Sequence, residues 1–192
     1  MLEYLEGWDH QLFFALNNGL STPVLDGLFW LFATAGNGTG MLGFALLGLW
    51  CFDRRALRRH WLWLVLSVIA GAVVVQGLKY GIARPRPLIT LAPLLASGEH
   101  YIHVVGEGLQ YRSFPSGHAQ AAASVFTYLW CLYPRYAVWW IMGMGLAALG
   151  RVYVGAHFPA DVLVGLGLGS LSAWAAVAVQ RWQGAQSDVN FD

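Results

Sequence analysis

The sequence predicts an all-α membrane protein, a polytopic helix bundle with six transmembrane helices and an N-terminal helix in the interface. Of its 192 residues, 57% are hydrophobic and only 11% are charged, whereas soluble domains carry about 25% charged residues. The stretch at residues 61–79 is by itself long enough to cross about 30 Å of hydrocarbon. These observations argue against a soluble enzyme, and the net charge of +1 gives no reason to expect a nucleic-acid partner.

The first quarter of the chain permits two interpretations. Residues 8–20 mix apolar and polar side chains, which is typical of a helix lying in the membrane interface. Residues 24–35 and 41–52 are apolar but short, and the glycine-rich segment 36–40 between them predicts a turn. We expect a hairpin of two short spans. The alternative is one interrupted span, which changes the helix count from six to five.

The later spans are separated by polar connections. We expect them at residues 61–79, 119–133, 136–150 and 162–179. In the last of these, Gly165, Gly169 and Ala173 form a row of small residues at four-residue intervals, which predicts close packing against a neighbouring helix. Residues 1–183 are therefore expected to form a single domain, and the polar residues 184–192 a disordered tail.

The loop at residues 53–60 indicates the orientation in the membrane. Arg54, Arg55, Arg58 and Arg59 form a dense basic patch, and such loops lie on the cytoplasmic side. The helix that follows then runs outward. The polar residues at its far end are therefore expected at the periplasmic or extracytoplasmic face of the inner, cytoplasmic membrane.

Three stretches hold nearly all the polar residues with potential reactivity. They are KYGIARPRP at 79–87, RSFPSGH at 112–118 and RVYVGAHFPAD at 151–161. Each lies at the end of an apolar helix, and with this orientation all three meet at one face of the membrane. Ionisable residues are costly in a membrane and usually functional. Each stretch alone has an ordinary explanation, as a basic flank, a helix cap or an interfacial ion pair, but the three together favour a site for an anion.

The second stretch has the features of an anion site. Pro115 suits the start of a helix, where free backbone N–H groups and the helix dipole attract anions. Ser116 adds a hydroxyl donor, Gly117 allows an oxyanion to approach the backbone, and His118 is placed to donate a proton to a bridging oxygen.

The other two stretches supply a nucleophile and cations. His157 precedes Asp161 by four residues, and a carboxylate at that spacing holds one imidazole nitrogen and leaves the other free to attack. Lys79, Arg86 and Arg151 provide positive charge for phosphate oxygens. Phosphoryl transfer needs these parts: cations, an in-line nucleophile and an acid for the leaving group.

The connection at residues 88–113 contains Glu99, His100, His103 and Glu107. Their spacing matches no tight metal-ligand motif. We therefore expect no metal site, and the sequence alone assigns this connection no role.

In their order, the three stretches resemble the motifs of the type 2 phosphatidic acid phosphatase superfamily of lipid phosphatases, KxxxxxxRP, PSGH and (S)RxxxxxHxxxD. The matching residues are Lys79, Arg86 and Pro87, then Pro115, Ser116, Gly117 and His118, and finally Arg151, His157 and Asp161. The resemblance covers residues 79–161. It departs from the family pattern at Gly150, where members commonly have a serine whose hydroxyl can bind phosphate.

The resemblance implies a metal-independent phosphatase that needs no cofactor and acts in two steps. His157 forms a phosphohistidine, Asp161 orients it, and His118 protonates the leaving group and then activates water. The other matched residues are implied to hold the phosphoryl oxygens, namely Lys79, Arg86, Ser116, Gly117 and Arg151. Arg84 and Arg112 lie off the matched positions and are expected to have auxiliary roles.

The resemblance thus implies an integral, multi-pass membrane enzyme that hydrolyses a lipid phosphate or diphosphate, surrounded by membrane lipids and without an obligatory protein partner. By similarity to bacterial members, undecaprenyl diphosphate is the first candidate substrate, phosphatidylglycerophosphate or phosphatidic acid the second, and lipid A the third. Lipid-to-lipid phosphotransfer and non-enzymatic binding or transport of a lipid phosphate are the alternatives. A soluble haloperoxidase, which shares these motifs, is disfavoured by the apolar spans.

Overall fold

The computed structural model describes residues 2–98 and 100–189, and these residues form helices and connecting segments without a β-strand. The prediction of an all-α protein is confirmed. In chain order the helices are α1 (Leu2–Gly19), α2 (Pro23–Ala35), α3 (Gly38–Phe52), α4 (Arg54–Ile82), α5 (Pro87–Thr90), α6 (Ala92–Ala96), α7 (Gly117–Leu132), the 3₁₀ helix η1 (Pro134–Tyr136), α8 (Ala137–Tyr153) and α9 (Pro159–Val189).

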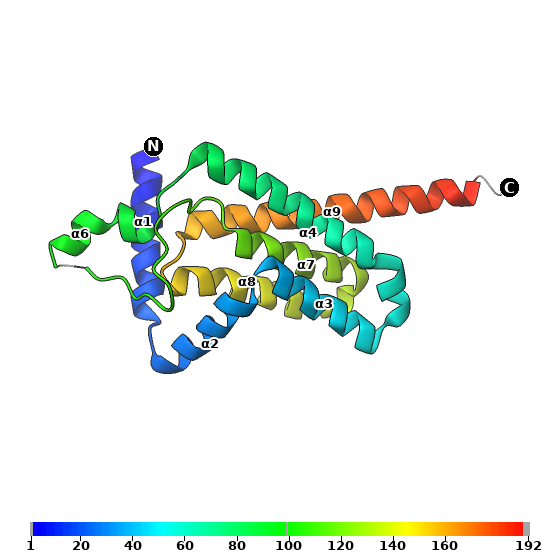
Figure 1. The fold of residues 1–192 in the computed structure, drawn as a ribbon, viewed down its shortest axis with the longest axis horizontal. Coiled ribbons are helices and arrows are strands. Elements are labelled where there is room, and N and C mark those ends of the chain that lie inside the picture. The colour runs from blue at the N-terminus through cyan, green and yellow to red at the C-terminus, as the bar shows by residue number, and fades with distance from the viewer. Residues whose placement is uncertain (1, 99, 190–192) are drawn as a thin grey trace.

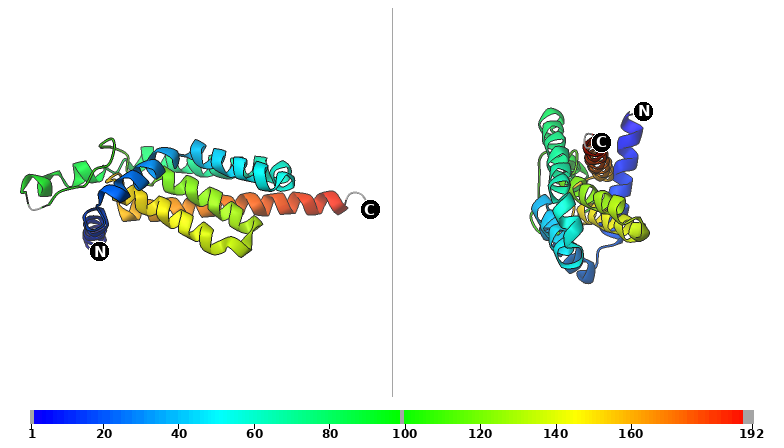
Figure 2. Two further views of the ribbon diagram at one scale, coloured as in Figure 1. Left: turned by 90° about the horizontal axis from the view of Figure 1, so that it is seen from below. Right: turned by 90° about the vertical axis from the view of Figure 1, so that its right-hand side faces the viewer.

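Helix α7 forms the centre of the bundle. Helices α3, α4, α8 and α9 all pack against it, and they run along its length in the views of Figures 1 and 2. Every residue from Ala119 to Val125 is buried. Leu64 of α4, Tyr128 of α7 and Ala173 of α9 belong to one apolar cluster. Because α7 is enclosed in this way, the residues at its N-terminus lie among the ends of the other helices.

Glycines allow α9 to approach α7 closely, as the row of small residues predicts. A Cβ atom at Gly169 would lie 2.1 Å from the Gln120 carbonyl oxygen, and one at Gly165 would lie 2.4 Å from the Ser116 carbonyl oxygen. Ala173, the next residue of the row, is fully buried. The two backbones are therefore in direct contact, and this contact holds the start of α9 beside the start of α7.

Replacing Gly169 by leucine is expected to push α9 away from α7 and to lower the free energy of unfolding by about 3 kcal/mol, because the tight contact offers no space for a larger side chain. Thermal unfolding in detergent measures the change. Gly167→Leu is the matched control, since a side chain at Gly167 meets no atom within 4 Å, and its Tm should stay near that of the wild type. Equal losses in the two variants would contradict the close contact.

Two segments among the described residues are long and apolar enough to cross a membrane, Arg54–Ala96, which contains α4, and Pro159–Gln186 of α9. Helices α2 and α3 pass the same test only as a pair, and they meet at 87°. A bend of this kind occurs in a broken span or in a re-entrant loop, so the expected hairpin and its alternative, one interrupted span, both stay predictions. The break between the two helices is short, because the Asn37 side chain accepts a hydrogen bond from the Gly40 amide and restarts the helix at once.

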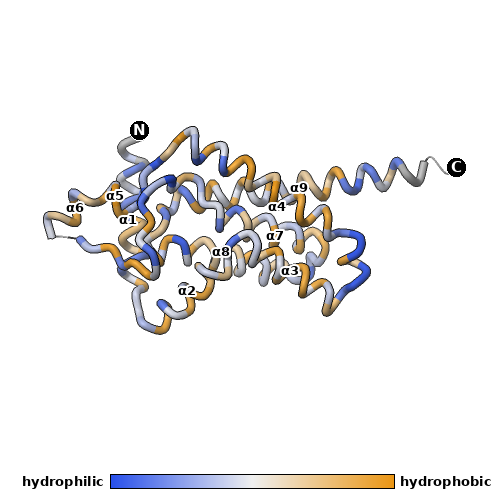
Figure 3. The backbone as a smooth tube through the Cα atoms, viewed as in Figure 1, coloured by the Kyte–Doolittle hydropathy of each residue, from blue (hydrophilic) through white to orange (hydrophobic). Residues whose placement is uncertain are grey.

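The count of six spans stays a prediction. Helices α7 and α8 have 16 and 17 residues, which is at the lower limit for crossing a bilayer. Hydropathy is nevertheless distributed as a membrane protein requires. In Figure 3 the turn between α3 and α4 is strongly hydrophilic, polar segments gather again at the opposite end of the bundle, and apolar helices lie between the two ends.

The first and last helices, α1 and α9, lie at the two ends of the described chain. Helix α1 lies across one end of the bundle (Figure 1), where it contacts α8 and α9. Its place in the membrane interface stays a prediction. Helix α9 projects beyond the other helices and continues to Val189. Residues 184–189 are thus part of α9, since neither glycine nor proline follows Gly184 to end the helix. The expected disorder of the tail stays a prediction, and residues 190–192 lie outside the described residues.

Candidate active site

The three polar stretches meet at the end of the bundle that α1 crosses (Figure 1). The eight site residues that the sequence predicted occupy the last turn of α4 (Lys79), the residue before α5 (Arg86), the start of α7 (Ser116, Gly117 and His118), the last turn of α8 (Arg151), and the start of α9 with the loop before it (His157 and Asp161). The charges of Lys79, Arg86 and Arg151 all act on the imidazole of His118. The structure therefore brings these residues together.

Asp161 is held by four neighbours, of which His157 is one. Its Oδ2 atom lies 3.5 Å from Nδ1 of His157 and accepts hydrogen bonds from the Phe158 amide, at 2.9 Å, and from the Ser113 hydroxyl. Its Oδ1 atom accepts a hydrogen bond from Arg84 at 2.8 Å. Both His157 and Asp161 are buried. The carboxylate therefore faces Nδ1 of the imidazole and leaves Nε2 free for other contacts.

Arg84, for which the sequence predicted an auxiliary role, and Asp9, which sequence reasoning missed, support this carboxylate from behind. The Arg84 guanidinium lies 2.8 Å from Asp161 and 2.8 Å from Asp9, and it stacks over the Phe158 ring. The second oxygen of Asp9 accepts a hydrogen bond from the Ala160 amide at the start of α9. Arg84 thus contacts two carboxylates and helps to position Asp161. Nothing in the sequence connects Asp9, in α1, to the three motifs.

Arg86 lies on the other side of the imidazole. It donates hydrogen bonds of 2.8 Å to the carbonyl oxygens of Tyr111 and Ala156. The nitrogen that bonds Ala156 also lies 3.3 Å from Nε2 of His157. Backbone carbonyl groups therefore fix a cation next to the imidazole nitrogen that does not face Asp161.

Lys79 is anchored in a similar way. Its ammonium group donates a hydrogen bond of 2.7 Å to the carbonyl oxygen of Arg112. The guanidinium of Arg112 itself stacks over the Tyr80 ring, 4.2 Å from the centroid. Arg112 thus supports the site through its backbone, and its own charge is engaged by an aromatic ring.

Arg151 carries a buried donor without a partner. The residue is 6% exposed, and its Nε atom has no hydrogen-bond partner in the part of the chain that the structure describes. Buried polar groups are nearly always paired, and an unpaired buried donor costs about 1–3 kcal/mol. An oxyanion bound beside Arg151 would supply the missing partner.

The pKa of His157 is low. Burial lowers this pKa to about 3, and the charges of Arg86 and Arg151 act in the same direction, against the opposing effect of Asp161. The imidazole is therefore neutral at pH 7. A neutral imidazole has a lone pair on one nitrogen, which is the form that a nucleophile needs.

Ser116 caps the N-terminus of α7, which is the ordinary explanation that the sequence left open for this stretch, and its role as a donor to an anion stays a prediction. Its hydroxyl accepts a hydrogen bond from the Ala119 amide at 3.5 Å. Its own amide donates to the Asp161 carbonyl oxygen at 2.9 Å. These contacts tie the start of α7 to the start of α9, so that the second and third motifs have a fixed relative position.

A cavity of about 400 Å³ lies beside His118 and Arg151. Trp30 of α2 lines it, together with Glu107 and Leu109 from the connection before α7. A smaller void of about 30 Å³, bounded by α2, α7 and α8, also touches His118 and Arg151. His118, the predicted acid, and Arg151, whose Nε atom lacks a partner among the described residues, therefore line the same two cavities, whose walls are partly apolar and partly polar.

The connection between α4 and α7 is anchored by the buried side chain of Asn17. This side chain donates to the carbonyl oxygens of His103 and Tyr153, at 2.8 and 2.7 Å, and accepts from the His103 amide. His103 also lies 2.7 Å from Asp26. Among the described residues, no group of three His, Cys, Asp or Glu side chains is placed to hold a metal ion, and Glu99 lies outside those residues.

The departure from the family pattern at Gly150 has a packing explanation. A Cβ atom at this position would lie 2.9 Å from the ring of Phe29. Phe29 is buried and packs against the Tyr153 ring at a centroid distance of 4.6 Å. The Phe29 ring thus occupies the space that a serine side chain would need.

Known proteins are similar in sequence to the part of the chain that holds the three motifs. The PAP2 superfamily model matches residues 60–185. Lipid A 1-phosphatase of Rhizobium johnstonii is 31% identical over 140 residues, which cover 68% of this chain and 53% of that protein. Undecaprenyl-diphosphatase BcrC of Bacillus subtilis is 29% identical over 121 residues, which cover 62% of this chain and 56% of that protein. The chain thus spans about half the length of the curated relatives it matches.

Solved structures share the fold over most of the chain. The crystal structure of Aquifex aeolicus LpxE has a TM-score of 0.71 at 28% identity, and the match covers 88% of this chain and 93% of that one. The PAP2-type phosphatidylglycerolphosphate phosphatase of Bacillus subtilis has a TM-score of 0.70 at 20% identity, with 93% and 87% covered. Because the motifs, the helix bundle and the family model agree, the chain belongs to the PAP2 superfamily.

Proposed function

We propose that this protein is an integral membrane phosphatase that removes a phosphate group from a lipid without the help of a metal ion. The observation that carries this proposal is the buried guanidinium of Arg151, whose Nε atom lacks a partner among the described residues, close to the neutral imidazole of His157. Preorganised cations around a nucleophile stabilise the charge of a transferring phosphoryl group. The names of the relatives support a phosphate carried by a lipid.

The first chemical step is attack by Nε2 of His157 on phosphorus. A nitrogen–phosphorus bond forms, the bond to the leaving oxygen breaks, and His118 transfers a proton to that oxygen. The Nδ1–H group donates to Asp161, which stabilises the positive charge on the ring. The separation of 3.5 Å between Nδ1 and Asp161 is expected to shorten as this charge develops.

The second step returns the enzyme to its starting form. His118, now neutral, accepts a proton from water, and the water oxygen attacks the phosphorus of the phosphohistidine. The nitrogen–phosphorus bond breaks and inorganic phosphate leaves. Lys79, Arg86 and Arg151 bind the nonbridging oxygens in both steps, and the amide of Gly117 at the start of α7 adds a donor.

The site is proposed to face the outer side of the membrane. The arginine-rich first turns of α4 lie at the opposite end of the bundle (Figure 3), and basic segments at the ends of spans stay on the cytoplasmic side. The lipid tail is proposed to lie against α2 and α8, where the smaller void adjoins His118.

Two lipids lead the candidate substrates. Undecaprenyl diphosphate is the first expectation from the sequence, and the relative BcrC carries that activity in its name. Lipid A gains support from the 31% identity to a lipid A 1-phosphatase. Glu107 in the cavity wall favours a headgroup with hydroxyl groups, because a carboxylate accepts hydrogen bonds from hydroxyls and repels a second phosphate. Phosphatidylglycerophosphate and phosphatidic acid complete the set.

Phosphate release by the purified protein in detergent with EDTA tests the proposal across these lipids. EDTA-resistant release is expected, with the highest kcat/KM for one of the two leading lipids. Arg151→Gln should lower kcat/KM by about 10²–10³, as removal of a transition-state donor does. Arg135→Gln is the matched control, because this guanidinium stacks on Tyr136 beyond the end of α7 and should have no effect.

Other outcomes would overturn parts of this assignment. Release that EDTA abolishes would contradict a metal-independent reaction. Transfer of labelled phosphate to a second lipid without inorganic phosphate would indicate a phosphotransferase. Binding without turnover of any lipid would indicate a lipid-phosphate binder.

A further inference from the structure

A second basic pocket lies between α4 and α9, at the end of the bundle far from His157. On α4, Arg59 lies 20 residues before Lys79. On α9, Arg181 lies 20 residues after Asp161. At 1.5 Å per residue each separation is about 30 Å, which is the hydrocarbon thickness of a bilayer. The pocket therefore lies at the level of the lipid headgroups in the opposite leaflet.

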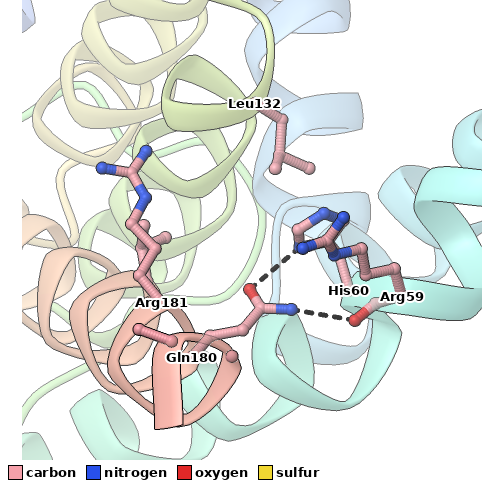
Figure 4. A pocket seen from close by; sticks show the side chains of 8 residues that line it. Arg59, His60, Leu132, Gln180 and Arg181 are labelled. Carbon is pink, nitrogen blue, oxygen red and sulfur yellow. Dashed lines mark hydrogen bonds between the residues drawn. The ribbon is translucent and has the colours of Figure 1, made fainter. Parts of the chain in front are cut away.

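Hydrogen bonds between helices form the back of this pocket (Figure 4). Gln180 donates a hydrogen bond of 2.9 Å to the Arg59 carbonyl oxygen, and its own oxygen lies 2.9 Å from Nδ1 of His60. The Tyr128 hydroxyl donates to the same Gln180 oxygen. These bonds join α4, α7 and α9, so the two arginines on either side of Gln180 extend from a fixed frame.

The lining suits a phosphate group attached to an apolar chain. The cavity has a volume of about 500 Å³, and no carboxylate of the described side chains lines it. Neither Arg59 nor Arg181 forms an ion pair with a carboxylate of the described residues. Leu132 and Val177 supply apolar walls. Two guanidinium groups beside apolar side chains match the phosphate and the upper acyl carbons of a phospholipid.

Two tryptophans independently place the pocket at the membrane surface. Trp61 follows directly after His60, and Trp182 follows directly after Arg181. Both are exposed, at 49% and 60%. Tryptophan is enriched where headgroups meet hydrocarbon. This position favours a lipid phosphate over a free phosphate ion.

We infer that this pocket binds the phosphate of an anionic phospholipid in the leaflet opposite the active site. Arg59 and Arg181 hold the phosphate, Leu132 and Val177 contact the chain, and Gln180 fixes the two helices that carry the arginines. The site is separate from the phosphatase machinery, so it does not depend on the identity of the lipid substrate.

Binding of spin-labelled phosphatidylglycerol tests the inference. The full-length protein is placed in phosphatidylcholine nanodiscs, and the motionally restricted fraction of the label is measured. Each arginine is expected to contribute about fivefold, so Arg59→Gln with Arg181→Gln should weaken binding by about 25-fold. Gly184 lines the cavity, and an added Cβ atom there meets no atom within 4 Å, so Gly184→Leu keeps both charges, is expected to occupy part of the cavity and should also weaken binding.

The matched control removes two charges from the same face without touching the pocket. Arg58 lines a different hollow beside Trp50 and Trp61, and Arg135 stacks on Tyr136. Their double replacement by glutamine should change binding little. Equal weakening in both double variants would show diffuse surface attraction and overturn the pocket. Displacement of the lipid by millimolar inorganic phosphate would assign the pocket to the free ion and overturn the lipid assignment.

Discussion

Replacing His157 by alanine is expected to lower kcat for phosphate release by at least about 10⁴-fold, because loss of a covalent nucleophile in a working triad has effects of this size. The cations of the site stay in place, so substrate binding should persist. The measurement is single-turnover release of labelled phosphate, with trapping of the phosphoenzyme under alkaline conditions, where a phosphohistidine survives. No labelled protein should form in the variant.

Two further variants sharpen this test. His100→Ala is the control, because His100 stacks on Phe14, away from the motif residues, and full activity is expected. His118→Ala should retain phosphoenzyme formation from an aryl phosphate, which needs no acid, and lose it with a lipid alcohol as leaving group. Equal loss with both substrates would count against the acid role, and normal release by His157→Ala would remove the nucleophile assignment.

The second large effect is expected for Asp161→Asn, with kcat lower by about 10³-fold and KM little changed. An asparagine keeps the shape of the side chain but not the charge that stabilises the imidazolium, and loss of that charge in a comparable triad is severe. It also leaves Arg84 with one carboxylate in place of two. Steady-state kinetics over a range of pH, together with a thermal melt, separates the chemical effect from the structural one.

Ser113→Ala provides the comparison for Asp161→Asn. It removes one hydrogen bond to the carboxylate and leaves the charge, so a loss of about 1 kcal/mol in transition-state stabilisation is expected, less than tenfold. An Asp161→Asn enzyme no slower than Ser113→Ala would show that Asp161 acts only as a structural anchor.

The sequence predicted the candidate site residues because they form local patterns. His157 and Asp161 lie four residues apart, in the loop before α9 and in its first turn, and the proposed anion site at the start of α7 is read from four consecutive residues. Their meeting point followed from the alternation of apolar spans, since successive helices return to the same face. Close packing of α9 on α7 followed from the spacing of Gly165 and Gly169.

The features that escaped prediction depend on contacts between distant segments. Asp9 reaches Arg84 across 75 residues, and Asn17 reaches Tyr153 across 136. No local pattern encodes either pairing. In the bend of 87° between α2 and α3, α2 packs against α8 and α3 packs against α7, and these contacts are not visible in the sequence. The apolar composition of the two helices is compatible with a hairpin as well as with an interrupted span.

The contact between Phe29 and Gly150 constrains how this chain can have diverged from relatives with serine at that position. Adding the serine first brings its Cβ atom within 2.9 Å of the buried ring. Shortening Phe29 first leaves a void, which costs about 3–5 kcal/mol when alanine replaces the ring. Either single change therefore lowers stability, so the residues at positions 29 and 150 are expected to covary among relatives, with a large aromatic ring opposite glycine and a smaller side chain opposite serine.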